Sequence, residues 1–306
     1  MDVAITAAPP GERIGGRRTM LAYIALTKPR VIELLLVTTV PVMFLAAGGV
    51  PNLWLVLATL LGGALSAASA NAFNCYIDRD IDRVMERTKH RPLATGDLSD
   101  RQALGFAWIA GVASVVWLAL VVNWLAAALS LAAILFYVLV YTLLLKRRTP
   151  QNIVWGGAAG CMPVLIGWAA VTGSLSWTPA VLFGIVFLWT PAHYWPLSMK
   201  YRADYQSVGV PMLAVVRGRA VVGLQVVLYA WATVACSLLL IPTASMGLVY
   251  SAVAVGAGAW FIVESHRLFS AAIRGGQLQP MRVFHSSISY LTLVFIAIGV
   301  DPLLPF

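Results

Sequence analysis

The sequence predicts an all-α membrane protein, and three observations carry that prediction. Of the 306 residues, 60% are hydrophobic and only 11% are charged, whereas soluble domains average roughly a quarter charged residues. Apolar stretches of about 20 residues recur along the whole chain, which is the length that a helix needs to cross a hydrocarbon core of about 30 Å. Because an open strand edge in lipid would leave backbone groups without hydrogen bonds, these spans are expected to be helical. The composition excludes a soluble enzyme.

Nine apolar segments are expected to form transmembrane helices of one polytopic bundle. Residues 1–26 are a polar segment that carries Arg13, Arg17 and Arg18, and residues 27–306 are a single transmembrane domain. The polar segment has no apolar core before a small-residue cleavage site, so no cleaved signal peptide is predicted. The helices are expected at about 31–49, 53–76, 103–122, 125–145, 152–171, 179–199, 219–240, 243–263 and 286–304.

The loops between these segments alternate in polarity. One set is long and polar and lies on the same side as the N-terminal segment, and all 21 Lys and Arg residues fall on that side. The other set is short and nearly uncharged. Since basic loops mark the cytoplasmic side, the N-terminus is expected inside and the C-terminus outside. The long set is at about 77–102, 146–151, 200–218 and 264–285, and the short set is at 48–52, near 123, at 172–174 and at 241–243.

Charge and cysteine content narrow the classes of partner. The net charge of +9 indicates an anionic partner, but no basic domain stands outside the membrane part, so nucleic acid is not expected. The three cysteines, Cys75, Cys161 and Cys236, are scattered and include no CxxC pair, which argues against disulfides and zinc fingers. The lipid bilayer is the one partner that composition alone predicts.

The second predicted helix ends in an acidic row. Asn74, Asp78 and Asp82 follow one another at intervals of four residues, which places their oxygens on one helix face, while Asp80 belongs to the other side. Two carboxylates and an amide at successive turns can hold Mg²⁺, which completes its octahedron with water and substrate phosphate. An alternative interpretation is a solvated helix end, in which neighbouring arginines pair with the acids.

A basic run follows the acidic row. Arg87, Lys89 and Arg91 lie within five residues of one another, and their side chains suit phosphate oxygens. Carboxylates also oppose the helix dipole at a C-terminal end, a conflict that a bound cation would remove. Acidic side chains that can bind a metal ion thus lie beside basic side chains that can bind a polyanion. This combination indicates a metal–diphosphate site.

These residues resemble the first aspartate-rich motif of the intramembrane prenyltransferases of the UbiA superfamily. Superfamily members often carry Asp directly after the first Asn, where this chain has Cys75, and that departure is typical of the protoheme IX farnesyltransferase branch. Further segments from residue 27 to residue 213 resemble the same branch in the same order. The matching strings are Asn74-x3-Asp78-x3-Asp82, Lys89-x-Arg91-Pro92-Leu93-x-x-Gly96, Thr27-Lys28-Pro29-Arg30, Leu145 to Val154, and Asp204-Tyr205 with Gly209 to Leu213.

The resemblance implies an Mg²⁺-dependent transfer of the farnesyl group of farnesyl diphosphate to a vinyl group of heme b. Water addition then gives heme O, made at the cytoplasmic side of a bacterial inner membrane. A heme A synthase or a terminal oxidase assembly factor would be a candidate protein partner. By the same resemblance the residues divide into three sets: metal and catalysis, Asn74, Asp78, Asp82 and Asp204; diphosphate, Arg87, Lys89, Arg91, Lys146 and Lys200; heme, His193, Arg30 and Arg147.

Two of these assignments stay open at the level of the sequence. His193 is expected either to be satisfied by neighbouring polar groups or to contact heme iron, since imidazole is a common heme ligand. It shares a helical face with Lys200 and Asp204 only if the helix continues past Pro191 and Pro196. The basic loop at 146–148 either anchors the topology at the lipid headgroups or contacts diphosphate or heme propionates.

Two rival functions are weighed against this one. A prenyltransferase with an aromatic, quinone-precursor acceptor would share the acidic motif, but Cys75 and the segment 209–213 argue against it. A transporter would place ionisable groups near the bilayer midplane on interrupted helices. Here the charges gather at one membrane face, which favours the enzyme.

Overall fold

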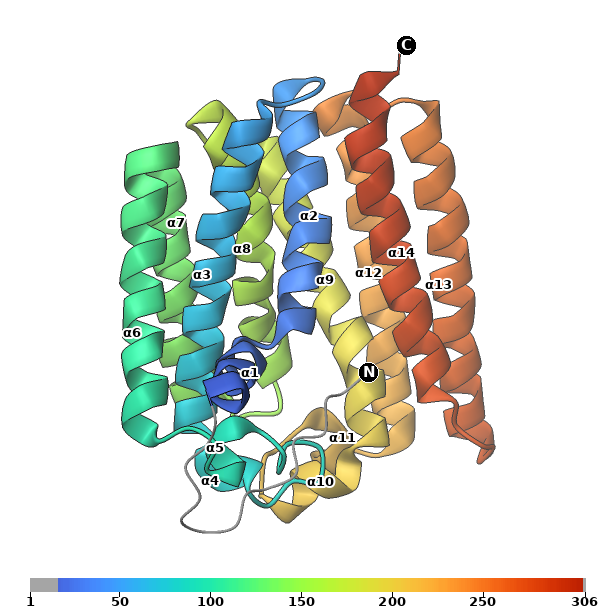
Figure 1. The fold of residues 1–306 in the computed structure, drawn as a ribbon. Coiled ribbons are helices and arrows are strands. Elements are labelled where there is room, and N and C mark those ends of the chain that lie inside the picture. The colour runs from blue at the N-terminus through green and yellow to red at the C-terminus, as the bar shows by residue number, and fades with distance from the viewer. Residues whose placement is uncertain (1–15, 305–306) are drawn as a thin grey trace.

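The computed structural model describes residues 16–304, except for the side chains of residues 30, 31 and 33–36. Within this part every regular element is a helix, so the predicted all-α class is confirmed. Figure 1 shows the long helices standing side by side as a bundle. They are α2 (Pro29–Ala47), α3 (Leu53–Ile77), α6 (Asp100–Trp117), α7 (Trp124–Leu135), α8 (Asn152–Thr172), α9 (Trp177–Lys200), α12 (Arg219–Ala244), α13 (Leu248–Arg274) and α14 (Pro280–Val300).

Short helices complete the fold. Two π-helical segments continue α6 and α7, and a 3₁₀ turn follows α14. These shorter elements are α1 (Gly16–Thr27), α4 (Arg79–Asp82), α5 (Pro92–Thr95), η1 (Leu118–Val122), η2 (Phe136–Leu145), α10 (Arg202–Ser207), α11 (Leu213–Val216) and η3 (Asp301–Leu303).

Eight helices in the described part are long and apolar enough to cross a membrane. The first predicted span corresponds to α2, within which 37–47 counts as a shorter apolar helix. Figure 1 nevertheless shows α2 beside α3 along much of the bundle. The expected total of nine spans and the sides of the two termini therefore remain predictions.

Two predicted boundaries are wrong, because a helix backbone satisfies its own hydrogen bonds and can continue where the apolar sequence stops. Pro242 lies inside α12, and the following turn falls at Ser245, which has a left-handed φ of 51°. The expected loop 264–285 shrinks to 275–279, between α13 and α14. Residues 16–26 of the polar N-terminal segment form part of α1, and residues 1–15 lie outside the described part.

The bundle has two similarly built parts. Helix α3 is followed by the short helices α4 and α5 and then packs on α6, whereas α9 is followed by α10 and α11 and then packs on α12. Contacts of α8 with α9 and of α2 with α14 join the two parts. The arrangement is that expected of two parallel repeats.

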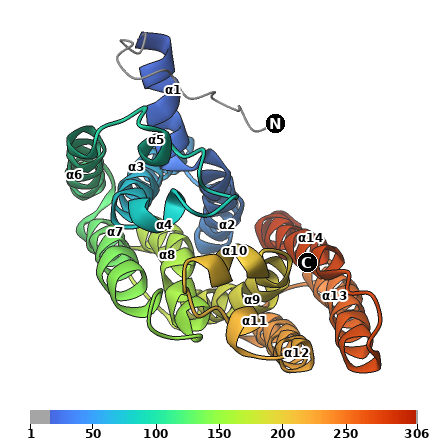
Figure 2. The ribbon, with the colours of Figure 1, turned by 90° about the horizontal axis from the view of Figure 1, so that it is seen from below.

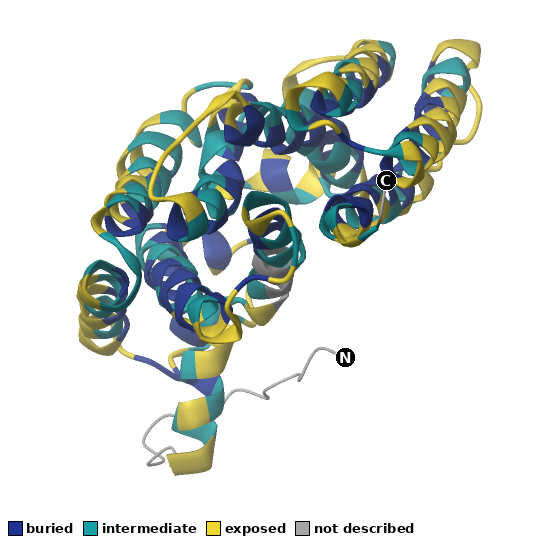
Figure 3. Ribbon diagram, turned by 90° about the horizontal axis from the view of Figure 1, so that it is seen from above, coloured by how far each residue is buried: buried dark blue, intermediate teal, exposed yellow. Residues whose placement is uncertain are grey.

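All four of these short helices lie at the same end of the bundle (Figures 1 and 2). We call it the basic end, because the four loops in which lysine and arginine gather are on that side. Buried residues face the interior of the bundle and exposed residues face outward (Figure 3). The packed helices thus hold the basic end, which contains the candidate site, in a fixed position.

Candidate active site

Asn74, Asp78 and Asp82 form a buried row where α3 reaches the basic end. Their relative exposures are 3%, 0% and 2%. The backbone N–H of Asp78 donates to the carbonyl of Asn74, and the N–H of Asp82 donates to that of Asp78, each at 2.9 Å. Helical spacing thus continues past the last residue of α3. The side chain of Asp80 is 60% exposed, so the burial agrees with the two faces expected from the spacing.

Basic side chains from the loop after η2 compensate the charges of Asp78 and Asp80. Lys146 forms an ion pair with Asp78, the carboxylate of which is fully buried. Arg147 lies 3.5 Å from Asp78 and holds both oxygens of Asp80, at 2.6 and 2.7 Å. The side-chain hydrogen bond from Arg147 lowers the pKa of Asp80 to about 2. A bidentate arginine therefore keeps the outer carboxylate away from the buried row.

Asp82, the second acid of the row, pairs with the basic run that follows it. The guanidinium of Arg91 lies 2.7 Å from an oxygen of Asp82, and both side chains are largely buried. Leaving either charge without its partner would be costly, because buried ions need pairing. Within the basic run 87–91, Arg91 is thus the residue that contacts the acidic row directly.

Asn74 is held by three neighbours. Its amide oxygen accepts from the Lys28 ammonium at 2.7 Å, and its nitrogen donates to Asp78 at 2.8 Å and to Thr142 at 3.2 Å. Lys28 has a left-handed φ of 54° between α1 and α2, and burial lowers its pKa to about 8. Lys28 was not among the site residues expected from the sequence; its place in the Thr27-Lys28-Pro29-Arg30 string was the available signal.

The π-helix η2 brings Thr142 and Lys146 to the row. Its wider turn is visible in two contacts to carbonyls five residues back: the Lys146 N–H donates to Tyr141 at 2.9 Å, and the Thr142 hydroxyl donates to Tyr137 at 2.8 Å. Single π-turns inside helices occur frequently at functional sites. An apolar sequence such as 136–145 gives no signal of this geometry, so Thr142 was missed.

The second polar segment differs from the expected arrangement. Helix α9 continues through Pro191 and Pro196 but ends at Lys200, and Asp204 belongs to the separate helix α10. Asp204 therefore does not share a helical face with His193 and Lys200, because the chain turns between the two helices. The three side chains have different neighbours.

Asp204 contacts the basic run 87–91 instead. Its carboxylate accepts from the backbone N–H of Arg87 at 3.1 Å, and the Arg87 guanidinium donates to the Tyr205 hydroxyl at 3.3 Å. That hydroxyl is 2.7 Å from the hydroxyl of Tyr194. Arg87 thus connects the segment after α4 with α10, one from each part of the bundle. Neither Tyr194 nor Tyr205 was among the site residues expected from the sequence, although Tyr205 belongs to the Asp204-Tyr205 string.

Several expected residues lie elsewhere. Lys89 is exposed and forms an ion pair with Glu86 at 2.5 Å. Lys200 is exposed, with its ammonium 5.4 Å from the centre of the Tyr201 ring. The side chain of Arg30 is outside the described part. The fold therefore brings Arg91 and Lys146 to the acidic row but neither Lys89 nor Lys200.

His193 lies in an aromatic stack between α9 and α14. Its ring stacks on Trp189 at 4.1 Å and on Phe284 at 4.4 Å between ring centres. Its Nδ1 atom is 2.8 Å from the hydroxyl of Ser287. This agrees with the interpretation of a histidine satisfied by its neighbours.

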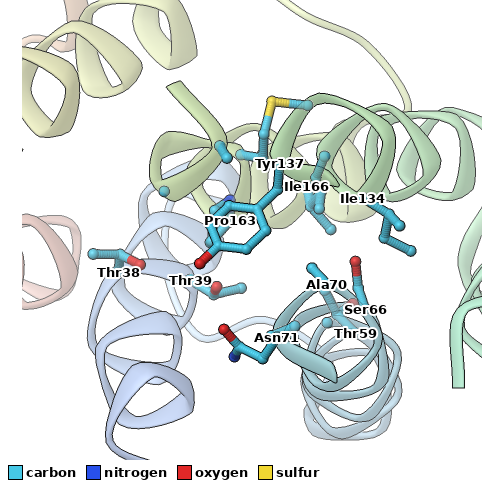
Figure 4. A pocket seen from close by; sticks show the side chains of 16 residues that line it. Thr38, Thr39, Thr59, Ser66, Ala70, Asn71, Ile134, Tyr137, Pro163 and Ile166 are labelled. Carbon is cyan, nitrogen blue, oxygen red and sulfur yellow. The ribbon is translucent and has the colours of Figure 1, made fainter. Parts of the chain in front are cut away.

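A cavity of about 140 Å³ lies deeper in the bundle. Asn71, one helical turn above Asn74, and Tyr137 point into it together with Thr39 (Figure 4). Its walls come from α2, α3, α7, η2 and α8, and they are mostly apolar. An apolar chamber one turn from a charged cluster suits a ligand with a charged head and an apolar tail.

The donor set of the row fits a magnesium ion. Asp78 and Asp82 offer hard carboxylate oxygens at successive turns, and Mg²⁺ commonly takes one or two carboxylates with water and phosphate. Among the described side chains, no three of the types His, Cys, Asp and Glu lie close enough to hold a metal ion. Asp204 therefore does not form such a group with Asp78 and Asp82.

The chain was then compared with known proteins. The model of the UbiA prenyltransferase family matches residues 35–288. The chain is 73% identical to the protoheme IX farnesyltransferase of Clavibacter michiganensis subsp. michiganensis over the full length of both. It is 71% identical to that of Leifsonia xyli, again over both full lengths, and 57% identical to that of Streptomyces avermitilis over 98% of this chain and 99% of the relative.

Solved structures share the fold. The structure of a UbiA homologue from Archaeoglobus fulgidus, bound to DMAPP and Mg²⁺, aligns with a TM-score of 0.65 over 91% of this chain and 99% of that one, at 18% identity. A structure of digeranylgeranylglyceryl phosphate synthase aligns with a TM-score of 0.76 over 93% and 98%, also at 18% identity. Motif, fold and relatives agree, and the chain belongs to the UbiA prenyltransferase family.

Proposed function

We propose that this membrane prenyltransferase transfers the farnesyl group of farnesyl diphosphate to a vinyl group of heme b, and that water addition yields heme O and diphosphate. The observation that carries the proposal is the 73% identity, over both full lengths, to a relative named protoheme IX farnesyltransferase. The buried acidic row beside basic groups and an apolar cavity supports the same chemistry.

The diphosphate would be held at the acidic row. Arg91 and Lys146 each pair with one carboxylate of the row, and both can turn to phosphate oxygens because ammonium and guanidinium groups bind them well. Arg87 is the third candidate, since its guanidinium contacts a phenol and no carboxylate among the described residues. Charge on the leaving diphosphate would be neutralised in part by Mg²⁺ held at Asp78 and Asp82.

The farnesyl chain would enter the cavity above the row. Its lining is apolar apart from hydroxyl and amide groups such as Thr39, Tyr137 and Asn71, and burial of the chain there stabilises binding. Enclosure by helices also keeps water away from the allylic carbon until the acceptor is in place. The site therefore separates the charged and apolar parts of one substrate.

Transfer breaks the bond between C1 of the farnesyl group and the diphosphate oxygen, which keeps the electron pair. The vinyl group of heme b supplies the electrons for the new carbon–carbon bond, and water then adds its oxygen to the remaining cation and releases a proton. The groups of this chain bind the leaving anion and exclude water during the first step. We do not extend the proposal to His193 as an iron ligand, because its ring is already stacked and hydrogen-bonded.

The basic end is proposed to face the cytoplasm of a bacterial cell, as the gathering of basic loops there indicates. Farnesyl diphosphate would then reach the site from the aqueous side and heme b from the bilayer. Any partner that receives the product, such as a heme A synthase or an oxidase assembly factor, would be expected to bind at the membrane.

The test is pigment extraction from membranes of a host that makes heme B but no heme O. Membranes with the chain, supplied with farnesyl diphosphate and Mg²⁺, should contain heme O resolved by chromatography, whereas membranes with Asp78→Asn should contain only heme B. Chelation of the metal should have the effect of the variant.

Two outcomes would contradict the proposal. Prenylation of 4-hydroxybenzoate in place of heme would show an aromatic acceptor, the first rival. Uptake of a solute into vesicles without release of diphosphate would favour a transporter.

A further inference from the structure

A groove outside the candidate site carries a second polar surface on α13. It is lined by residues that recur every three or four positions and so lie on one helical face. The groove has a volume of about 590 Å³ and is open to the surroundings. Its lining is Val263, His266, Arg267, Ser270, Ala271, Arg274 and Gly276.

The length of α13 places this face at the headgroup level of a bilayer. The helix has 27 residues, which span about 40 Å at 1.5 Å per residue, whereas the hydrocarbon core is about 30 Å thick. Measured from Leu248, the last seven or so residues extend beyond the core. Ser270 and Arg274 therefore lie where lipid phosphates are found, and Arg267 lies at the edge of the core.

The polar groups of the groove are arranged as hydrogen-bond donors. The indole N–H of Trp231 on α12 donates to Nε2 of His266 at 3.1 Å. Because the accepting nitrogen carries no proton in that contact, the proton of the neutral ring is on Nδ1, which is then free to donate. His266 is exposed, so an imidazole donor stands beside the guanidinium groups.

The charges of the groove are only partly compensated. Glu264 is 6% exposed and pairs with Arg267 at 2.5 Å and with Arg282 of α14 at 3.2 Å. Arg274 has no ion-pair partner among the described residues. The two guanidinium groups that line the groove, those of Arg267 and Arg274, face this one carboxylate, which leaves an excess of one positive charge. An anion is therefore the complementary ligand.

We propose that the groove binds the phosphate of an anionic phospholipid. Arg274, His266 and the Ser270 hydroxyl would contact the phosphate, and the acyl chains would lie along the exposed apolar side chains of Val263 and Trp231. A lipid is favoured over a soluble anion because the face below the groove is apolar and the residues above it are at the membrane surface. This site is separate from the acidic row and independent of the proposed function.

The test titrates dioleoylphosphatidylglycerol onto the purified full-length protein in detergent and counts bound lipid by native mass spectrometry. Removal of two donors in Arg274→Gln with His266→Gln should weaken the tightest lipid by about tenfold or more, the scale of lost charge-assisted hydrogen bonds. Ser270→Ala provides a second, milder variant. Arg282→Gln is the matched control, because it removes an exposed arginine that also pairs with Glu264 but does not line the groove.

Two probes distinguish the sources of the ligand chemistry. Dioleoylglycerol has the same chains without phosphate and should not bind at the groove, and glycerol phosphate has the anion without chains and should bind far more weakly. Unchanged phosphatidylglycerol binding in the double variant, or an equal loss in Arg282→Gln, would overturn the proposal. So would glycerol phosphate binding of equal strength with the same dependence on Arg274, which would identify a soluble anion.

Unfolding of the double variant is checked by circular dichroism and by its thermal midpoint. The alternative role of Arg274 is compensation of the α13 C-terminal dipole. In that case Arg274→Gln lowers the midpoint while lipid affinity stays unchanged, an outcome that would also refute the lipid site.

Discussion

At the scale of single residues, burial separates three neighbouring aspartates. Asp78 and Asp82 are buried and paired with Lys146 and Arg91, whereas Asp80 is exposed and held by Arg147. We expect Asp78→Ala and Asp82→Ala to lower kcat by orders of magnitude, because neutralisation of transition-state charge is worth several kcal/mol.

Asp80→Ala is the matched control for both variants. It should lower kcat by less than about tenfold, since an exposed ion pair contributes about 1 kcal/mol or less. Diphosphate release from farnesyl diphosphate and heme b measures all three rates. Equal losses at Asp80 and Asp78 would mean that the helical-face argument fails.

Two residues of the basic run, Arg91 and Lys89, offer a second contrast between a buried and an exposed side chain. Arg91 reaches Asp82 at 2.7 Å, whereas Lys89 points to solvent and pairs with Glu86. Arg91→Ala should lower kcat/KM for farnesyl diphosphate by at least about tenfold, because it also leaves a buried carboxylate unpaired. Lys89→Ala should change it by less than about threefold, the scale of a surface ion pair. If Lys89→Ala lowered kcat/KM as much as Arg91→Ala does, the result would show that the exposed lysine moves to the substrate.

At the scale of elements, the contact between α8 and η2 leaves no room for a side chain at Gly156. A Cβ atom there would lie 2.2 Å from Cδ2 of Tyr141. Gly156→Ala should therefore destabilise the protein by about 1–3 kcal/mol, the usual cost of overpacking, and shift η2 with its Lys146.

Gly105→Ala, in α6 with nothing within 4 Å of the added atom, should instead stabilise slightly, because alanine is the better helix former. Thermal unfolding in detergent compares the two variants. A midpoint for Gly156→Ala at or above that of the unchanged protein would contradict the packing argument.

The cavity offers an element-scale test of chain binding. Gly160 of α8 lines the cavity, and a Cβ added there meets nothing within 4 Å. Gly160→Leu should fill the space and raise the KM for farnesyl diphosphate by about tenfold or more, as pocket contacts of a few methylene groups do. The KM for geranyl diphosphate, which is one isoprene unit shorter, should rise less. Equal effects on the two diphosphates would indicate that the chain lies elsewhere.

At the scale of the whole molecule, the gathering of basic loops at one end predicts the topology. Reporter fusions at Asp97 and Arg274 should read as cytoplasmic, and fusions at Thr172 and Phe306 as external. The reason is that translocation of loops rich in Lys and Arg is disfavoured, and all 21 such residues fall on the side of the long polar loops. A cytoplasmic reading at Phe306 would refute the count of nine crossings.

The sequence by itself determined the local features of this protein. Long apolar stretches predict helices because lipid demands internal backbone hydrogen bonds, and a spacing of four residues predicts that Asn74, Asp78 and Asp82 share a face because the helix repeats every 3.6 residues. Both inferences depend on neighbours within a few positions. The all-α class and the buried row agree with them.

Only the tertiary structure decided which distant groups meet the row. Asn74 contacts Lys28 and Thr142 across 46 and 68 residues, and Arg87 contacts Asp204 across 117. Such contacts depend on how helices pack, on a π-turn in η2 and on the end of α9 at Lys200, none of which has a local periodic signal. Residue type alone could not distinguish Arg91 from Lys89, because both carry a positive charge in one short loop and only packing turns one inward.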